Sequence, residues 1–158
     1  MRPMSRRGFS LIELVIVVVI IGIIAAIAIP RMSRGSQGAQ ESALVGNLAV
    51  LRNAVDMFTN EHGGTKPTDA SSIANQLTKE TNVSGSTTIG AGEIAYGPYL
   101  RDVPPLPVGA NQGQTAFGAT LGTASVGWIY DTSHAKLVYA NCPDAEVSPQ
   151  TGKKYNTY

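Results

Sequence analysis

The sequence predicts an α+β protein: a long N-terminal helix, half membrane-spanning and half amphipathic, packed against a small C-terminal domain with a short helix and a small antiparallel sheet. Three patterns predict this fold. An apolar run of membrane length opens the chain, apolar residues at helical spacing follow it, and two β-rich runs lie near the C-terminus. The 158 residues suit one ordinary domain. The predicted segments are a leader at 1–8, an apolar helix at 9–30, its amphipathic continuation at 31–62 and a globular α/β head at 63–158.

The composition argues against several classes of function. Lys and Arg number 12 against 11 Asp and Glu, without a basic patch, so we expect no nucleic-acid partner. A single cysteine, Cys142, excludes an intramolecular disulfide and a cysteine metal cage, and His62 and His134 lack ligand spacing. We therefore expect no catalytic residues, no cofactor and no enzyme activity. An exported hydrolase with a triad assembled in space stays an open alternative.

The N-terminal run has the length of a membrane span. Three arginines lie within 1–8, and the 21 residues 9–29 contain only Ser10 and Glu13 as polar residues. As a helix the run would measure about 31 Å, against a hydrocarbon core of about 30 Å. The positive-inside rule keeps the arginine end in the cytoplasm. We therefore expect a single-pass membrane protein whose head lies outside the cytoplasm.

Three interpretations of this run compete. A cleaved secretory signal would end near Ala26–Ala28, and a twin-arginine export signal would use residues 5–9. Neither explains Glu13, a carboxylate that costs roughly 2.5–3.5 kcal/mol within an apolar span. In the third, cleavage between Gly8 and Phe9 creates an α-amino group four residues before Glu13.

That amine provides Glu13 with a partner in a neighbouring chain. Helices that pack with a stagger of about one turn bring the carboxylate of one chain to the amine of the next. At about 4 Å and an effective dielectric constant near 20, the attraction is about 4 kcal/mol before desolvation. A wrong stagger leaves both charges unpaired in lipid, so the pair also selects the register. The residues therefore predict a polymer.

The same residues resemble a known family. The stretch Gly8–Glu13, with the apolar run and Pro30 after it, is similar to the N-terminal signature of type IV pilins and of the pseudopilins of type II secretion systems. The resemblance implies that a prepilin peptidase cuts after Gly8, that Phe9 becomes the N-methylated first residue, and that Glu13 guides assembly with Phe9. The implied partners are that peptidase and methyltransferase, an inner-membrane assembly platform and further copies in a filament.

The helix is expected to continue with a different pattern. Its apolar residues recur at spacings of four, three, four and three and form one stripe: Leu44, Leu48, Leu51, Val55 and Phe58. The opposite face holds Gly46, Asn53, Asp56 and Asn60. We expect the head to cover the stripe. A helix bend is expected around Gly22 and Pro30, since glycine is a weak helix former and proline lacks the N–H donor.

The head is predicted from shorter signals. Residues 67–79 suggest a short helix with Asp69 as N-cap, and residues 81–92 a surface loop. The runs 126–131 and 136–141 predict a hairpin. Its aromatic residues, Trp128 and Tyr130, share one strand face and are expected to cover the stripe.

Two features bear on the choice between the subfamilies. Gly97–Leu100 and the prolines after it are similar to a region of major pseudopilins, although Leu106 stands where that family often has an acid. The single cysteine also departs from the disulfide-closed loop of many pilins. Major pseudopilins often bind calcium in an acidic C-terminal loop, and calcium prefers six to eight oxygen ligands. Here Asp144 and Glu146 are the only nearby acids. A calcium site completed by Asp131 and backbone carbonyls stays an open alternative, but it is not the favoured one.

The favoured hypothesis is therefore a pseudopilin of a type II secretion system that forms a short periplasmic filament. The alternative is a type IV pilin, major or minor, for adhesion, motility or DNA uptake. An exported soluble or membrane-anchored binding domain is the third hypothesis, and Glu13 argues against it.

Overall fold

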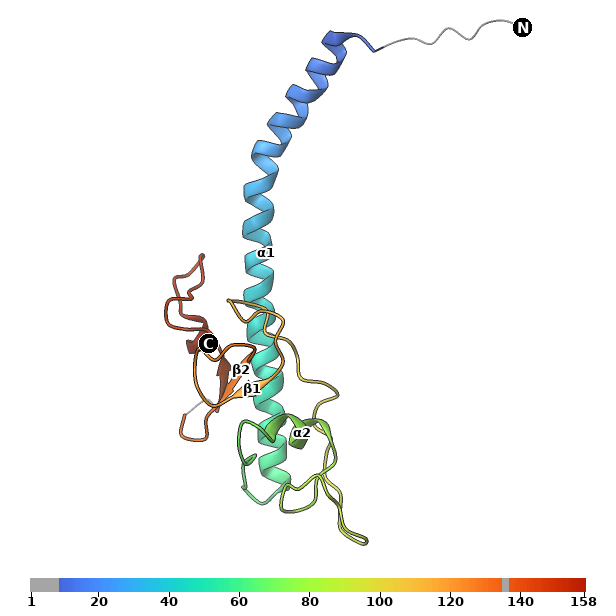
Figure 1. The fold of residues 1–158 in the computed structure, drawn as a ribbon, viewed down its shortest axis with the longest axis vertical. Helices are drawn as coiled ribbons and strands as arrows, with labels where there is room; N and C mark the ends of the chain where they lie inside the picture. Colours follow the sequence, from blue (N-terminus) through green and yellow to red (C-terminus); the bar gives the residue numbers. More distant parts are fainter. Residues whose placement is uncertain (1–8, 135–136) are drawn as a thin grey trace, which may run out of the picture. The chain divides into compact units, whose positions relative to one another are not determined.

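The computed structural model describes residues 9–134 and 137–158 (Figure 1). The predicted leader at 1–8, with Gly8, and the start of the second predicted strand lie outside these residues. The helices are α1 (Leu11–Glu61), α2 (Ile73–Thr78) and the 3₁₀ helix η1 (Tyr155–Thr157), and the strands are β1 (Phe117–Gly118), β2 (Trp128–Tyr130) and β3 (Val138–Ala140). The α+β class is confirmed. The chain divides into two compact units, Met1–Gly38 and Ala39–Tyr158, and the boundary falls within α1.

In the first unit the only regular element of the described residues is the N-terminal part of α1. The helix is 51 residues long and passes through Gly22 and Pro30, so neither residue ends it. A bend at these two residues stays a prediction. One stretch of the described residues, Leu11–Ala28, is long and apolar enough to cross a membrane, with a mean hydropathy of 3.2.

In the second unit the predicted stripe forms the centre of a core. Leu44, Leu48, Leu51, Val55 and Phe58 are each no more than 1% exposed. The residues predicted for the opposite face, Gly46, Asn53, Asp56 and Asn60, are all exposed. The amphipathic pattern is therefore confirmed, and this part of α1 is stabilised by burial of one face rather than by helix propensity alone.

The sheet is mixed, so the purely antiparallel sheet that the sequence predicted is wrong. Strand β2 pairs with β3 in antiparallel register, with Ile129 opposite Tyr139, as the predicted hairpin requires. Strand β1 pairs with β2 in parallel register, with Phe117 opposite Trp128. The two residues of β1 lack the run of β-branched and aromatic residues that marks a strand, and their pairing depends on tertiary packing.

The predicted core aromatics of β2 are buried. Trp128 is fully buried, and its indole Nε1 donates a hydrogen bond of 2.8 Å to the Pro104 carbonyl. The hydroxyl of Tyr130 donates one of 2.8 Å to the Pro67 carbonyl. Both polar atoms are therefore satisfied, which allows these large side chains to cover the stripe without an unpaired donor.

The second helix is shorter than predicted, and Asp69 does not cap it directly. Helix α2 begins at Ile73 after Ser72. The Asp69 carboxylate accepts hydrogen bonds from the backbone N–H of Ser71 (2.8 Å) and of Ser72 (2.9 Å). It therefore forms a turn before the helix, because an aspartate can bond to backbone two residues ahead.

Candidate functional site

The candidate site is the start of α1. Glu13 lies here and is the one acidic residue of the apolar span. The Glu13 carboxylate lies in the first turn and accepts a long hydrogen bond of 3.4 Å from the Ser10 N–H. The Leu14 N–H donates to the Ser10 carbonyl over 3.2 Å, which closes the first turn. A carboxylate at a helix N-terminus is also stabilised by the helix dipole. Glu13 thus has a weak partner within its own chain.

This intrachain contact was missed in the sequence, although the signal was present. Ser10 and Glu13 have the Ser-x-x-Glu spacing of a capping box, in which the acid reaches back to the N-cap backbone. The bond is long and exposed, so it leaves most of the carboxylate's capacity for other donors.

The rest of the span presents apolar side chains to its surroundings on all sides. Phe9 is 80% exposed, and the large apolar residues that follow are all about half exposed or more: Leu11, Ile12, Leu14, Val15, Ile16, Val17, Val18, Val19, Ile20, Ile21, Ile23, Ile24 and Ile27. A helix that is apolar all round is a membrane span or is covered by other chains. Within the described residues of Met1–Gly38, none of Leu11–Ala28 is buried.

The predicted site residues fall into two groups. Phe9 and Glu13 lie together at the exposed start of the helix, while Gly8 lies outside the described residues. Gly22 lies in the middle of the span, and a Cβ atom at this position would meet no atom within 4 Å. Small size at Gly22 is therefore not required by packing within this chain.

The comparisons with known proteins identify this segment. Residues 3–29 match the family described as "Prokaryotic N-terminal methylation motif". The chain carries a prepilin signature. No curated protein and no solved structure matches the chain. This signature is found in type IV pilins and pseudopilins. The matched residues include the predicted cleavage site, the predicted first residue and Glu13.

The prepilin signature determines several general properties. It implies processing by prepilin peptidase and pilus-type assembly. It is a motif of structural, pilin-type proteins, which are generally non-enzymatic. Together with the apolar helix it fits a membrane-anchored protein with an exported head.

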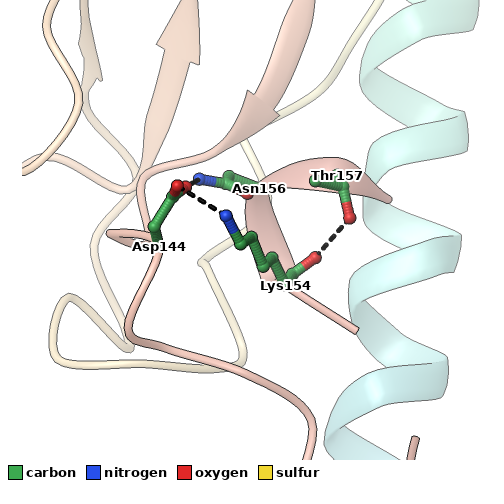
Figure 2. Close-up of polar contacts among 4 residues, drawn as sticks. All are labelled: Asp144, Lys154, Asn156 and Thr157. Atoms are coloured by element: carbon green, nitrogen blue, oxygen red, sulfur yellow. Dashed lines mark hydrogen bonds and ion pairs between the residues drawn. The ribbon is translucent and has the colours of Figure 1, made fainter. Parts of the chain in front are cut away.

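The acids that the sequence offered for calcium take part in separate hydrogen-bond sets. The Asp144 carboxylate receives the Lys154 ammonium over 2.6 Å and the Asn156 side-chain amide over 2.9 Å (Figure 2). Asp131 accepts from the Ser133 backbone and hydroxyl, and Glu146 from the Ala110 N–H over 3.1 Å. In the described residues no three or more His, Cys, Asp and Glu side chains form a group that could hold a metal ion.

The hydrogen bonds of Asp144 with Lys154 and Asn156 join two parts of the C-terminal segment through a pair of opposite charges. The Lys154 ammonium, and then the Asn156 amide, hold the pKa of the Asp144 carboxyl below its ordinary value. The Thr157 hydroxyl donates to the Lys154 carbonyl over 2.7 Å, so the lysine is anchored at its backbone as well (Figure 2). Lys154 therefore provides the Asp144 carboxylate with a positive partner, at a largely exposed position.

The buried nucleophilic and basic side chains of the head serve packing. Burial, and then a hydrogen bond with Glu146, raise the pKa of the Cys142 thiol to about 12, so it is not a thiolate at neutral pH. His62 stacks on Phe58 with ring centroids 3.8 Å apart. Its Nδ1 lies 2.7 Å from the Phe58 carbonyl and its Nε2 3.0 Å from the Asn82 carbonyl. These contacts join the end of α1 to the loop after α2.

Proposed function

We propose that the chain is a structural subunit of a type IV pilus-like filament, most specifically a pseudopilin of a type II secretion system. Prepilin peptidase cuts it between Gly8 and Phe9, and the mature subunit assembles through lateral packing of its apolar helix. The observation that carries this proposal is the apolar helix Leu11–Ala28, none of which is buried, with Glu13 in its first turn, inside the matched prepilin motif.

The apolar helix can be covered by lipid or by neighbouring copies of the same helix. A lipid bilayer covers the apolar side chains of this helix, but it gives the Glu13 carboxylate no partner. A neighbouring copy with a free α-amino group at Phe9 provides both an apolar surface and a cation. The Ser10 contact is long, and its donor is a neutral backbone N–H. An α-amino group adds the attraction of a full opposite charge, so it is the stronger partner for the carboxylate.

The choice of a pseudopilin depends on weaker support. The Gly97–Leu100 segment resembles pseudopilins, and in the head it fastens two helices. Both Tyr99 and Leu100 donate backbone N–H bonds of 2.9 Å to the Leu77 carbonyl, and the Tyr99 hydroxyl donates to Glu61 over 2.7 Å. A type IV pilin for adhesion, motility or DNA uptake is the alternative, and loss of surface fibres rather than of protein secretion on deletion of the gene would support it.

Peptide mass spectrometry of the protein from its own membranes tests the processing step. We expect a first residue Phe9 that carries one additional methyl group. A first residue just after Ala28 would overturn the proposal in favour of an exported soluble domain, and an intact Met1 would favour a membrane-anchored binding domain.

A substitution tests the assembly step. We expect Glu13→Gln to abolish filaments, seen by electron microscopy and by cross-linking of Val18→Cys between copies, while the cleaved protein still reaches the membrane. The buried Cys142 thiol leaves the cross-linking background low. Glu80→Gln, at an exposed position of the head, is the matched control and should assemble normally. Filaments of ordinary number and length from Glu13→Gln would contradict the role of the carboxylate.

A further inference from the structure

The head contains a polar cavity at a distance along the chain from the N-terminal span. It has a volume of about 340 Å³ and lies between α2 and the loop formed by residues 84–87. Thr68, Ser72, Asn75 and Gln76 provide one side, and the loop provides the other. This volume is at the lower end of the range of roughly 300–1,000 Å³ that ligand sites occupy.

The walls of the cavity are held in place by one buried amide. Gln76 is 5% exposed and connects three segments. Its Oε1 accepts from the Thr68 N–H over 3.1 Å, and its Nε2 donates to the Gly85 carbonyl over 2.9 Å and to the Thr68 hydroxyl over 3.1 Å. All of its hydrogen-bonding groups are thus engaged in fixing the site, which preorganises the cavity for a ligand.

The loop on the other side is equally constrained. Asn82 is 9% exposed, and its Oδ1 accepts from the Ser84 N–H (3.1 Å), the Ser84 hydroxyl (2.8 Å) and the Ser86 N–H (3.0 Å). Gly85 has φ +78°, and a Cβ atom there would lie 3.0 Å from the Phe58 ring. The loop is therefore held by the Asn82 side chain, and its Gly85 backbone packs against the Phe58 ring, where a larger residue would be strained.

The chemistry of the lining selects the class of ligand. Its side chains are hydroxyls and amides, and none of the residues that line the cavity is charged or aromatic. Such groups both donate and accept hydrogen bonds but offer nothing to neutralise an ion. The Asn75 amide and the Thr87 hydroxyl line this cavity, and within the described residues neither side chain forms a hydrogen bond.

We propose that this cavity binds a neutral saccharide of one or two rings. A sugar presents hydroxyl groups that both donate and accept, matching the lining, and it carries no charge that would be left unpaired. The Asn75 amide and the Thr87 hydroxyl make the direct contacts, and Gln76 positions the walls. None of the residues that line the cavity lies on the N-terminal span, so the tests of this site do not depend on filament assembly.

Amide chemical shifts of the full mature protein test the site. The protein is placed in micelles of a detergent without a sugar headgroup, and maltose, lactose and N-acetylglucosamine are added separately to tens of millimolar. We expect the amides of Gly85 and Ser86 to shift with at least one sugar, with a dissociation constant in the millimolar range. No shift with any of the three sugars would overturn the proposal.

Substitutions distinguish this cavity from general sugar contacts. We expect Asn75→Ala to weaken the binding by about 5- to 10-fold, as loss of one hydrogen bond predicts. Asn60→Ala, at an exposed position on α1, should bind as the unchanged protein does. Equal binding by Asn75→Ala would overturn the assignment, and so would shifts produced by a neutral Ser-Thr-Gly peptide but by no sugar. Preserved shift dispersion in each variant confirms that it is folded.

Discussion

The two parts of α1 share one helical backbone but differ in how they are stabilised. In Ala39–Tyr158 the helix buries one stripe under the head and exposes polar and small residues opposite. In Met1–Gly38 the described part exposes apolar side chains on all sides. The part of α1 after Gly38 thus buries its apolar surface within the chain, whereas the part before it depends on lipid or on other copies to cover its apolar surface.

Removal of the span should have the largest effect. We expect a chain that begins at Ala39 to lose membrane association entirely while its head stays folded, because the core residues all lie after Gly38. Cell fractionation measures the first result, and a cooperative denaturation curve by circular dichroism measures the second. An unfolded or aggregated chain would show that the head needs the span.

A pair of truncated side chains sharpens the same comparison. Phe58→Ala removes a ring that is 1% exposed, and we expect the free energy of unfolding of the head to fall by about 3–5 kcal/mol. Val18→Ala removes an apolar side chain that is 61% exposed, and we expect that free energy to stay unchanged. Urea denaturation of both variants in micelles gives the values. Similar losses for the two variants would break the comparison.

One polar clamp holds the head to α1. The Arg52 guanidinium donates to the Val138 carbonyl from Nε (3.1 Å) and Nη2 (2.9 Å), and to the Tyr158 carbonyl from Nη2 (2.7 Å). Partial burial lowers the pKa of Arg52, but the residue stays charged at neutral pH. We expect Arg52→Met to cost about 1–2 kcal/mol in the same assay.

The control for this substitution is Arg101→Met. The Arg101 side chain is 98% exposed, and its contact with Asp102 is 3.9 Å long, so we expect no measurable change. A loss for Arg101→Met as large as that for Arg52→Met would assign the effect to charge rather than to the clamp.

Acid should weaken the head through its turn carboxylates. A hydrogen bond from the Ser71 hydroxyl is the largest cause that lowers the pKa of Asp69, and one from Ser133 does the same for Asp131. A folded-state pKa below the unfolded value contributes stability above about pH 4, and this contribution is lost as pH falls through the folded value. We expect the melting temperature of the head to decrease when the pH is lowered below about 4.

Asparagine at Asp69 isolates the titration. Asp69→Asn keeps an acceptor oxygen for the turn but cannot be protonated in this range, so we expect a flatter melting profile between neutral pH and acid than in the unchanged protein. An unchanged slope would show that other carboxylates carry the acid dependence.

The smallest effect should come from divalent cations. Because the Lys154 ammonium already neutralises Asp144, we expect the melting temperature to be the same with calcium and with a chelator. Lys154→Ala should lower it only slightly, since both side chains are largely exposed. A clear rise in melting temperature on addition of calcium would instead indicate an oxygen-lined site in the C-terminal segment.

Local patterns predicted the parts of the fold that depend on short-range periodicity. The stripe from Leu44 to Phe58 and the hairpin that contains Trp128 were correct, because side-chain spacing reports the period of a helix or a strand. The length of α2 was wrong, because the turn around Asp69 replaces the first part of the expected helix. The two-residue strand β1 was not predicted at all.

The functional features likewise include some that the sequence predicted and some that it did not. The prepilin signature, with Glu13 in its apolar run, was readable without coordinates because a membrane span and a charge within it are properties of consecutive residues. Sequence reasoning did not find the Arg52 clamp or the cavity beside Gln76. The clamp joins residues up to 106 positions apart along the chain, as Arg52 and Tyr158 are. The cavity lies within residues 68–87, but it depends on how the irregular loop at 84–87 turns back toward α2.

The membrane span, its prepilin signature, the amphipathic half of α1 and the α+β class could be predicted from the sequence, since each follows from the order and spacing of neighbouring residues. The parallel pairing of β1, the contacts of Arg52 and Lys154, and the cavity between α2 and the 84–87 loop became visible only in the folded chain. These features depend on how irregular loops turn and bring particular groups together, and such turns have no periodic pattern in the sequence.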